Sequence, residues 1–378
     1  MARLGDICDV RDGTHDSPPY VAEGYPLVTS KNIVNGNLDM SDISYISLED
    51  YNKINERSKV STGDIIMPMI GTIGNPYIIE EFTDFAIKNV ALIKFPNDIV
   101  YNKYIFHFLN SEKFKKYIVE NNRGGTQKFL SLKDIRNIQL NLPSLAEQMD
   151  VVEKLDKVCD LISIRNKQLE KLDELVKSRF IELFGDQESN PFGWVQYTVG
   201  ECCTIKSGTT LSAEVENEGG SIPYVKVGDM NFPGNERYIT TSSRYVSEET
   251  AGNGLFEVGS IIFPKRGGAI GTNKKRMTKL PICADLNVMS VSSKGKLLPE
   301  YLFAYFDLVD LGSLSDGSSV PQINNKNIAP LLICIPPIEL QNQFATFVEQ
   351  TDKSKFEIQK SLNQLETLKK ALMQKYFG

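Results

Sequence analysis

The spacing of apolar residues divides the chain into four segments. From Leu145 to Phe184 apolar side chains recur at alternating steps of four and three, with polar residues between them. This heptad pattern predicts one amphipathic helix of about five repeats, roughly 60 Å long at the rise of an α-helix. A second, less regular stripe runs from about Ile338 to Phe377 and predicts a second long helix. Neither stripe is stable in water alone, so we expect the two helices to pack against each other.

The expected contact residues lie on one face of each helix. They are Val151, Leu155, Val158, Ile162, Leu169, Leu172 and Val176 in the first helix, and Phe344, Val348, Ile358, Leu362, Leu365 and Leu372 in the second. Arg165 and Arg179 fill the two gaps of the first stripe, and Leu368 is assigned to the second. Lys355 and Lys369 stand at seam positions of the second stripe, which therefore predicts a less regular contact.

The two remaining segments, residues 1–143 and 189–336, are predicted to be β-rich. In the first, Tyr25 to Ile33 is an extended run that ends at the turn Asn35-Gly36-Asn37. Ile65 to Ile70 and Asn89 to Phe95 have the continuous apolar character of buried strands. Asn102 to Asn121 has helical spacing. The fold class is therefore α+β: two β-rich mixed α/β domains separated by two long helices.

The second half of the chain repeats the first. The repeated positions, in order, are Leu4-Gly5-Asp6-Ile7 and Val199-Gly200-Glu201-Cys202, Gly13 and Gly208, Gly63-Asp64-Ile65-Ile66 and Gly259-Ser260-Ile261-Ile262, Gly71 to Gly74 and Gly268 to Gly271, and Phe184-Gly185 and Phe377-Gly378. A period near half the chain is far too long for a solenoid. It indicates a duplicated unit of domain plus helix, with domains at 1–143 and 189–336 and helices at 144–188 and 337–378. Such a duplication implies pseudo-two-fold symmetry and an antiparallel coiled coil.

Composition excludes several classes of protein. The 378 residues are 41% hydrophobic and 24% charged, which is typical of a globular domain. Because no apolar run approaches 18 residues and the start has no signal-peptide core, we expect a cytoplasmic protein without a membrane span. The six cysteines show no C-x-x-C spacing and only His15 and His107 are present, so we expect reduced thiols and no metal site.

No convincing catalytic constellation is present. Ser17-Pro18-Pro19-Tyr20 resembles the tetrad of DNA amino-methyltransferases, but the glycine-rich Phe-x-Gly-x-Gly turn for S-adenosylmethionine is missing. A Pro-Pro turn explains the segment better. The chain also lacks the phosphate-binding loop Gly-x-x-x-x-Gly-Lys-Ser/Thr of an ATPase, and two distant histidines give little support to a nucleophile site. We therefore expect no catalytic residue.

Basic and polar residues next to glycines form a different kind of candidate site. The net charge of −6 argues against nucleic acid, yet residues 265–279 hold six basic residues and no acid. Lysine and arginine neutralise phosphates, and arginine, asparagine and glutamine contact base edges. The DNA-binding candidates are Lys31, Lys88, Arg123, Thr126, Gln127, Lys128, Lys226, Lys265, Arg266, Lys274, Lys275, Arg276, Ser319 and Gln322.

Taken together, the order and duplication of these motifs make the whole chain resemble the specificity subunit of Type I restriction-modification enzymes. The resemblance rests on Gly5-Asp6-Ile7, Gly63-Asp64-Ile65-Ile66 and Phe184-Gly185, on the helix entries Pro143-Ser144-Leu145-Ala146-Glu147-Gln148 and Pro336 to Gln341, and on Asn190-Pro191-Phe192-Gly193-Trp194 before the second domain. One departure is that Pro336-Pro337-Ile338-Glu339-Leu340-Gln341 lacks the Glu-Gln pair. Singly these matches are weak, but their order and duplication make them specific.

The resemblance implies a non-catalytic subunit that binds double-stranded DNA. Each target-recognition domain would read one half of a bipartite, asymmetric site through the major groove. The helices would set the spacing and dock two methyltransferase subunits, which two restriction and translocase subunits would join. S-adenosylmethionine, ATP and Mg²⁺ would then belong to these partners and not to this chain.

Two other classes of function remain open from the sequence. One is a self-sufficient DNA adenine methyltransferase, which would bind S-adenosylmethionine. The other is a duplicated coiled-coil scaffold, which would show no salt-dependent DNA binding.

Overall fold

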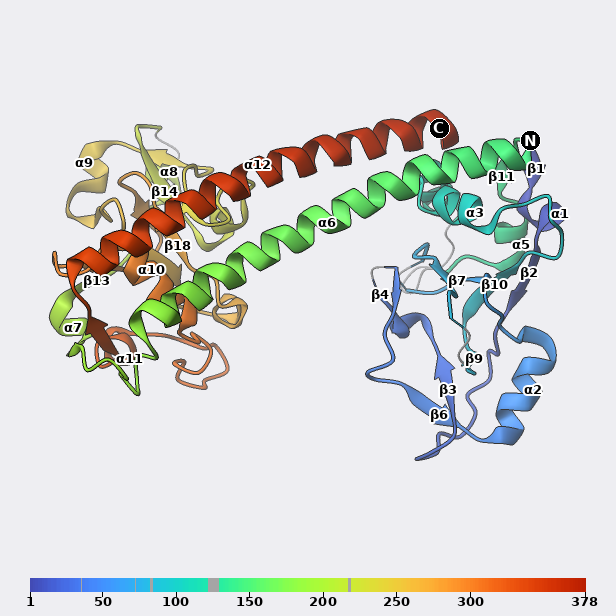
Figure 1. Cartoon of the computed structure of the whole chain (residues 1–378), viewed down its shortest axis with the longest axis horizontal. Coiled ribbons are helices and arrows are strands. Elements are labelled where there is room, and N and C mark those ends of the chain that lie inside the picture. The colour runs from blue at the N-terminus through green and yellow to red at the C-terminus, as the bar shows by residue number, and fades with distance from the viewer. Residues whose placement is uncertain (35, 72, 82–83, 122–128, 217–218) are drawn as a thin grey trace. The chain divides into compact units, whose positions relative to one another are not determined.

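A computed structural model describes residues 1–378 except 35, 72, 82–83, 122–128 and 217–218 (Figure 1). The elements of the first domain are β1 (Ala2–Arg3), α1 (Leu4–Ile7), β2 (Asp9–Asp12), β3 (Tyr25–Val28), η1 (Ser30–Asn32), β4 (Ile33–Val34), β5 (Asn37–Leu38), β6 (Ser44–Ile46), α2 (Leu48–Ser58), β7 (Ile65–Pro68), β8 (Tyr77–Ile78), β9 (Ala86–Ile87), β10 (Val90–Lys94), α3 (Asn102–Leu109), α4 (Glu112–Asn121), α5 (Leu132–Arg136) and β11 (Gln139–Leu140). Helix α6 (Leu145–Phe184) follows.

The second domain follows a similar order of elements, with differences in its short helices and edge strands. They are β12 (Val195–Thr198), α7 (Val199–Cys202), β13 (Cys203–Ser207), α8 (Ala213–Glu216), β14 (Ile222–Val225), η2 (Val227–Asn231), β15 (Tyr238–Ile239), β16 (Tyr245–Val246), α9 (Glu248–Ala251), η3 (Gly252–Gly254), β17 (Ile261–Pro264), η4 (Gly268–Thr272), β18 (Arg276–Thr278), β19 (Cys283–Ala284), β20 (Val288–Ser293), α10 (Pro299–Leu308), α11 (Asn325–Ile328) and β21 (Leu332–Ile335). Helix α12 (Ile338–Phe377) follows.

Strand pairing confirms the duplication. The first domain has the antiparallel sheet β2-β10-β7-β8, and the second has β13-β20-β17-β18 with β15 added at the edge. Each domain also has a three-stranded mixed sheet, β6-β3-β9 and β16-β14-β19, whose β3–β9 and β14–β19 pairs are parallel. A short antiparallel ladder, β1–β11 or β12–β21, joins the two ends of each domain. The same topology has therefore formed twice.

The central strands β7 and β17 are buried on both faces. In β17, Ile261 and Phe263 face a core with α10, while Ile262 faces a second core on the other side of the sheet. Strand β7 divides its side chains in the same way between two cores. Burial on both faces requires a continuous apolar run, as the sequence shows at both places.

A close backbone contact explains why Gly13 and Gly208 recur. Gly13 N donates to Val90 O and Gly208 N donates to Val288 O, both at 3.0 Å. A Cβ atom at Gly13 would lie 2.1 Å from Ile87 O, and one at Gly208 would lie 2.2 Å from a carbonyl oxygen. Only glycine fits this approach of one chain segment to another. The loop that leaves β2 or β13 is thereby fixed against the start of β10 or β20.

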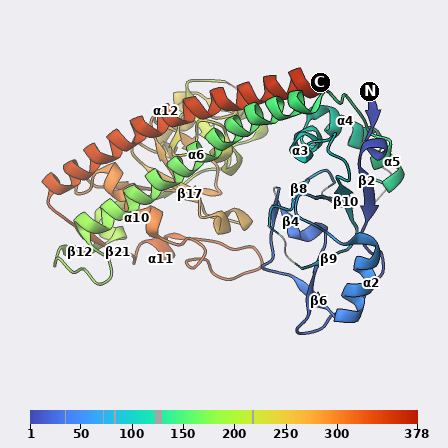
Figure 2. The same ribbon diagram turned by 45° about the vertical axis from the view of Figure 1, so that its right-hand side comes forward.

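Each domain forms a compact unit with halves of both long helices. The first unit is Met1–Asn166 with Lys360–Gly378, and the second unit is Lys167–Gln359. Within each unit the helices lie side by side (Figures 1 and 2). In the second unit, Phe180 packs on Phe344 and Lys355 pairs with Asp173. The residue numbers of the contacts in α12 fall as the residue numbers in α6 rise. The two helices therefore pack antiparallel, as predicted.

Most residues of the predicted seam are buried or half-buried. Val151, Leu155, Val158, Val176, Phe344, Val348 and Leu362 are buried, and Ile162, Leu169, Leu172, Ile358, Leu365 and Leu372 are half-buried. Leu368 is 46% exposed, so its assignment to the seam is wrong. Met373 and Phe377 are buried in its place and join the core of the first unit.

Equivalent glutamines anchor the two helices to their domains. Gln148 Oε1 accepts from Tyr101 N at 2.8 Å, and Gln148 Nε2 donates to Ile99 O and Pro143 O. Gln341 Oε1 accepts from Leu298 N at 2.8 Å, and Gln341 Nε2 donates to Lys296 O and Pro336 O. Gln341 therefore takes the place of Gln148, although the residue before it is leucine and not glutamate.

Two predicted elements are interrupted in the structure. The run Tyr25 to Ile33 is not one strand, because Thr29 and Asn32 form a capping box that turns Ser30–Asn32 into a 3₁₀ helix. The stretch Asn102 to Asn121 is two helices, α3 and α4. Phe114 N donates to Ser111 Oγ at 3.2 Å, so Ser111 caps a new helix.

The described residues contain no helix long and apolar enough to cross a membrane. Nor does this part of the chain bring together three or more His, Cys, Asp or Glu side chains that could hold a metal ion. All six cysteines are free, and Cys159 is the one that is not fully buried.

Candidate nucleic-acid interface

Two loops of the second domain meet at the end of β17. Lys265 N donates to Asn287 O, and Ile323 N donates to Lys265 O, both at 2.9 Å. Arg266 forms an antiparallel bridge with Gln322, and Gly267 N donates to Pro321 O at 2.8 Å. The structure therefore brings the predicted residues Lys265, Arg266 and Gln322 together at the end of β17.

This loop end carries positive charge that is not neutralised locally. Arg266 is exposed, and Lys265 Nζ donates to Ser207 Oγ at 3.0 Å, a neutral partner at the end of β13. Neither basic residue has an acidic partner among the described residues. Ser319 lies on the exposed part of the adjoining loop. Such cations beside exposed hydroxyl and amide groups are typical of a surface that contacts phosphate and bases.

Three of the predicted basic residues are engaged elsewhere. Lys275 is 3% exposed, and its Nζ donates to Val309 O at 2.6 Å and to Asn273 Oδ1 at 2.9 Å. Burial lowers the pKa of Lys275 to about 8. The prediction that Lys275 contacts DNA is therefore wrong, because its ammonium group lies inside the domain. Arg276 donates to Met230 O, and Lys274 Nζ donates to Asn231 Oδ1.

Lys226 is held by an acidic residue. Its Nζ lies 2.6 Å from Glu216 Oε1, and Arg244 Nε lies 3.1 Å from Glu216 Oε2. The buried Glu216 thus compensates part of the positive charge of both residues. Lys226 contributes less to a phosphate-binding surface than the unpaired Lys265 and Arg266.

The first domain places its candidates at the matching end. Lys88 Nζ donates to Ser17 Oγ at 2.6 Å, and Lys31 is exposed in η1. The loop candidates Arg123, Thr126, Gln127 and Lys128 lie outside the described residues. The residues that follow them are fixed as in the second domain, because Phe129 bridges Ile70 and Leu130 N donates to Met69 O at 2.9 Å.

Sequence reasoning missed a polar cluster at this end of the first domain. His15 Nδ1 lies 2.8 Å from Asn89 Oδ1, and His15 Nε2 lies 2.9 Å from Asp12 Oδ2. Arg57 of α2 pairs with the buried Asp12. Two hydrogen bonds raise the pKa of His15; the one with Asn89 has the larger effect and the one with Asp12 the smaller. The repeated Asn-Val at residues 89–90 and 287–288 was the sequence signal that could have identified this position.

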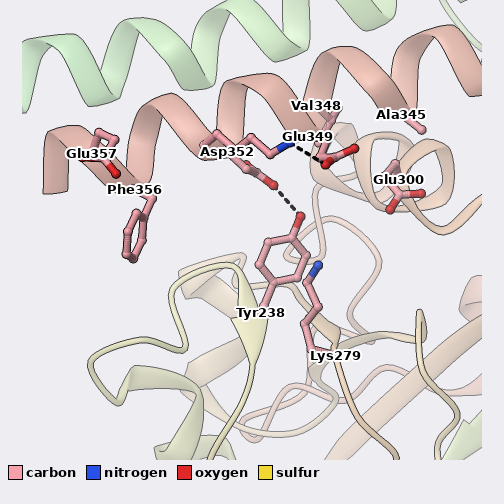
Figure 3. A pocket seen from close by; sticks show the side chains of 10 residues that line it. Tyr238, Lys279, Glu300, Ala345, Val348, Glu349, Asp352, Phe356 and Glu357 are labelled. Atoms are coloured by element: carbon pink, nitrogen blue, oxygen red, sulfur yellow. Dashed lines mark hydrogen bonds and ion pairs between the residues drawn. The ribbon is translucent and has the colours of Figure 1, made fainter. Parts of the chain in front are cut away.

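A cavity of about 500 Å³ opens beside α12 in the second unit (Figure 3). Tyr238 OH donates to Asp352 Oδ2 at 2.5 Å, and Lys353 pairs with Glu349 at 2.8 Å across its wall. Glu300, Glu349, Asp352 and Glu357 line the cavity, against Lys279 and Lys353. This excess of carboxylates repels phosphate, so the cavity does not belong to the nucleic-acid interface.

Comparison with known proteins identifies one family that matches both halves of the chain. Residues 1–174 and 191–367 match the family model described as Type I restriction modification DNA specificity domain. The MjaIX specificity subunit of Methanocaldococcus jannaschii is 23% identical over 99% of this chain and 91% of its own length. The EcoKI specificity subunit of Escherichia coli K12 is 21% identical over 95% of this chain and 83% of its own length.

Two solved structures share the fold. The S subunit of a Type-I restriction-modification system from M. genitalium has a TM-score of 0.57 at 15% identity, and the match covers 100% of this chain and 95% of that one. A structure described as the basis of complex assembly and conformational transition of the type I R-M system has a TM-score of 0.59 at 18% identity, covering 100% and 96%.

Proposed function

The chain belongs to the family of Type I restriction modification DNA specificity domains, and we propose that each of its globular domains reads one half of a bipartite, asymmetric DNA site. It is a non-catalytic specificity subunit, as its relatives are. Its partners in the proposal are double-stranded DNA, two methyltransferase subunits and two restriction and translocase subunits. S-adenosylmethionine, ATP and Mg²⁺ would bind to those subunits, and the complex would act in the cytoplasm, where its DNA lies.

One observation carries this proposal: the same scaffold presents different side chains at the same loop end. In the second domain, Arg266 and Gln322 form a bridge at this end, and Arg266 is exposed. In the first domain, Ile70 and Phe129 form the matching bridge, and Phe129 is 40% exposed. The topology fixes where a loop meets DNA, while the side chains determine which sequence is bound. Two such surfaces suit a target with two unlike halves.

The helices support a role in spacing and docking. Their seam is buried within each unit, so their length is fixed by folded structure. Outside the seam, Leu161, Ile164, Leu175 and Phe356 are 43%, 49%, 48% and 68% exposed. Exposed apolar side chains of this kind, two in each unit, fit surfaces that methyltransferase subunits would cover in the assembled complex.

The experiment is a domain exchange in cells that also make the methyltransferase subunit. Residues 1–143 are replaced by the first domain of another family member that keeps tyrosine at the place of Tyr104, because that ring packs on Phe377 at 5.1 Å. Sequencing that detects methylated adenine then gives the motif. We expect one half of the motif to change and the other to stay.

The reciprocal exchange of residues 189–336 is the matched control and should change only the other half. If either exchange altered both halves, or if neither altered the motif, the two domains would not act as independent readers.

A further inference from the structure

Equivalent asparagines stand at the DNA-facing loop end of both domains. Asn89 precedes β10 and Asn287 precedes β20, the strands that pair with β7 and β17 in the same register of the duplicated sheet. Met69 N donates to Asn89 O at 3.4 Å, and Lys265 N donates to Asn287 O at 2.9 Å. Each asparagine therefore lies beside the residue that leaves the central strand for the candidate loops.

In the second domain, Asp285 fixes the orientation of the Asn287 amide. Asn287 Nδ2 donates to Asp285 Oδ1 at 2.6 Å, and Asn287 N donates to the same oxygen at 2.9 Å. A carboxylate only accepts hydrogen bonds, so the amide nitrogen must be the atom that faces it. The outward atom of Asn287 is consequently Oδ1, an acceptor.

In the first domain, His15 fixes the opposite orientation. Both ring nitrogens lie against oxygen, Nε2 against the carboxylate of Asp12 and Nδ1 against Asn89 Oδ1. This arrangement is satisfied by an imidazolium ion, which donates from both nitrogens. No described residue accepts from Asn89 Nδ2, so the outward atom of Asn89 is a donor.

We propose that Asn89 and Asn287 are specificity-determining residues that present opposite hydrogen-bonding groups to the major groove while His15 is protonated, a donor from the first domain and an acceptor from the second. The inference rests on the proposed DNA-reading function. In the major groove an outward Oδ1 accepts from the amino group of adenine or cytosine. An outward Nδ2 donates to guanine O6 or N7, adenine N7 or thymine O4. His15 and Asp285 are positioning residues, since they act on DNA through the asparagines.

The protonation state of His15 sets the preference of the first domain. Neutral His15 keeps Nε2–H on Asp12, so Nδ1 becomes an acceptor and the Asn89 amide turns to donate to it. Oδ1 then faces outward, and the donor becomes an acceptor. The charged groups that face His15 are Asp12, whose hydrogen bond and charge favour the protonated ring, and Arg57, whose charge opposes it. At Asn287 the partner is the carboxylate of Asp285, which accepts a hydrogen bond from the amide nitrogen.

The test uses the full chain with its methyltransferase subunits and duplexes of the motif found by methylation mapping. Each duplex carries one base analogue that lacks either an exocyclic amino group or a major-groove acceptor. Affinity is measured for wild type, Asn89→Ala and Asn287→Ala, with Asn97→Ala and Asn325→Ala as exposed controls. We expect one amino deletion in the second half-site to weaken wild type roughly tenfold and Asn287→Ala hardly at all.

In the first half-site, removal of one major-groove acceptor should weaken DNA binding by wild type at pH 6 to the same extent. The same analogue should leave the affinity of Asn89→Ala unchanged. As pH rises through the raised pKa of His15, this penalty should fade and an amino-deletion penalty should replace it. His15→Ala should remove the pH dependence while DNA binding persists.

The outcomes separate the two levels of the argument. Loss of all sequence-selective, salt-dependent binding in wild type would overturn the proposed function itself. Selective binding in which the asparagine variants respond to every analogue as wild type does would overturn only the specificity role. Equal sensitivity of both half-sites to the same class of analogue at pH 6 would refute the opposite polarity.

Discussion

Replacing Gln341 by alanine should destabilise the second unit selectively. The side chain is 1% exposed and makes three hydrogen bonds, to Leu298 N at 2.8 Å, Pro336 O at 3.0 Å and Lys296 O at 3.3 Å. A buried group that loses its partner costs about 1–3 kcal/mol. The main loss is at Leu298 N, at the start of α10, while the two carbonyl oxygens regain part of their bonding through water.

We therefore expect the free energy of unfolding to fall by about 3 kcal/mol. The higher helix propensity of alanine offsets a few tenths of a kcal/mol of this loss. At a urea slope of about 1–3 kcal/mol per molar, the midpoint should fall by roughly 1–3 M.

The chain contains its own reporter for this measurement. Trp194 is the single tryptophan, and it lies in the second unit with Nε1 donating to Phe184 O at 3.2 Å. Its fluorescence follows unfolding of that unit, whereas circular dichroism follows both. Gln341→Ala should shift the fluorescence transition, and Gln148→Ala should shift only the part seen by circular dichroism.

Gln343→Ala is the matched control, because Gln343 is exposed two residues along the same helix. A fluorescence midpoint that moves by less than 0.3 M, by the rough slope above, would refute the anchoring role of Gln341. Equal shifts from Gln148→Ala and Gln341→Ala would refute the division into two units.

Four further predictions follow from the same structure. Lys265→Ala and Arg266→Ala should each reduce the slope of log affinity against log salt by about one, as measured by a salt titration of DNA binding; an unchanged slope would remove them from the interface. Burial lowers the pKa of Lys275 in the folded state from 10.5 to about 8, so between these pH values the unfolded chain binds more protons than the folded one. The free energy of unfolding should therefore rise by roughly 3 kcal/mol from pH 8 to pH 10.5, relative to the same difference in Lys275→Met. Urea titrations of both proteins at each pH measure this. Gly208→Ala should lower stability by about 2 kcal/mol or more, because its Cβ would lie 2.2 Å from Ala284 O, whereas Gly228→Ala, with open space around it, should change it little. Inserting one heptad after Leu172 lengthens the helix by about 10 Å and should lengthen the spacer between the two half-sites of the methylated motif by up to about three base pairs. An active variant with the original spacer would contradict the role of the helices in setting this spacing.

Periodicity predicted the long helices because it depends on many residues at once. The predicted Leu145 to Phe184 and Ile338 to Phe377 are the bounds of α6 and α12. Local capping decided what periodicity missed. Helix α2 lies in a segment expected to be β-rich, yet Ser47 Oγ accepts from Asp50 N at 3.1 Å and starts it. Ser47 before Leu48 was a helix-start signal that outweighed the turns around it.

The candidate site was predictable as a place but not as a set of residues. Glycines and neighbouring basic residues marked the loops at β17, and the structure joins those loops. A run of basic residues in the sequence does not show which side chains face outward. Lys274 is half-buried, Lys275 is buried and Arg276 binds backbone carbonyls. The cluster of Asp12, His15 and Asn89 spans more than seventy positions, so only folding reveals it.

The first unit is built from two separate segments of the chain, which has a consequence for its synthesis. Its core includes Met373 and Phe377, with Phe377 packed on Tyr104 and Phe108. At about 5–20 residues per second, the ribosome makes these residues roughly 10–40 s after Asn166. During that interval the nascent first domain exposes the apolar surface of α3 that α12 will cover. The second unit, a continuous stretch of chain, completes its folding earlier. The domain that is translated first is therefore the last to complete its core.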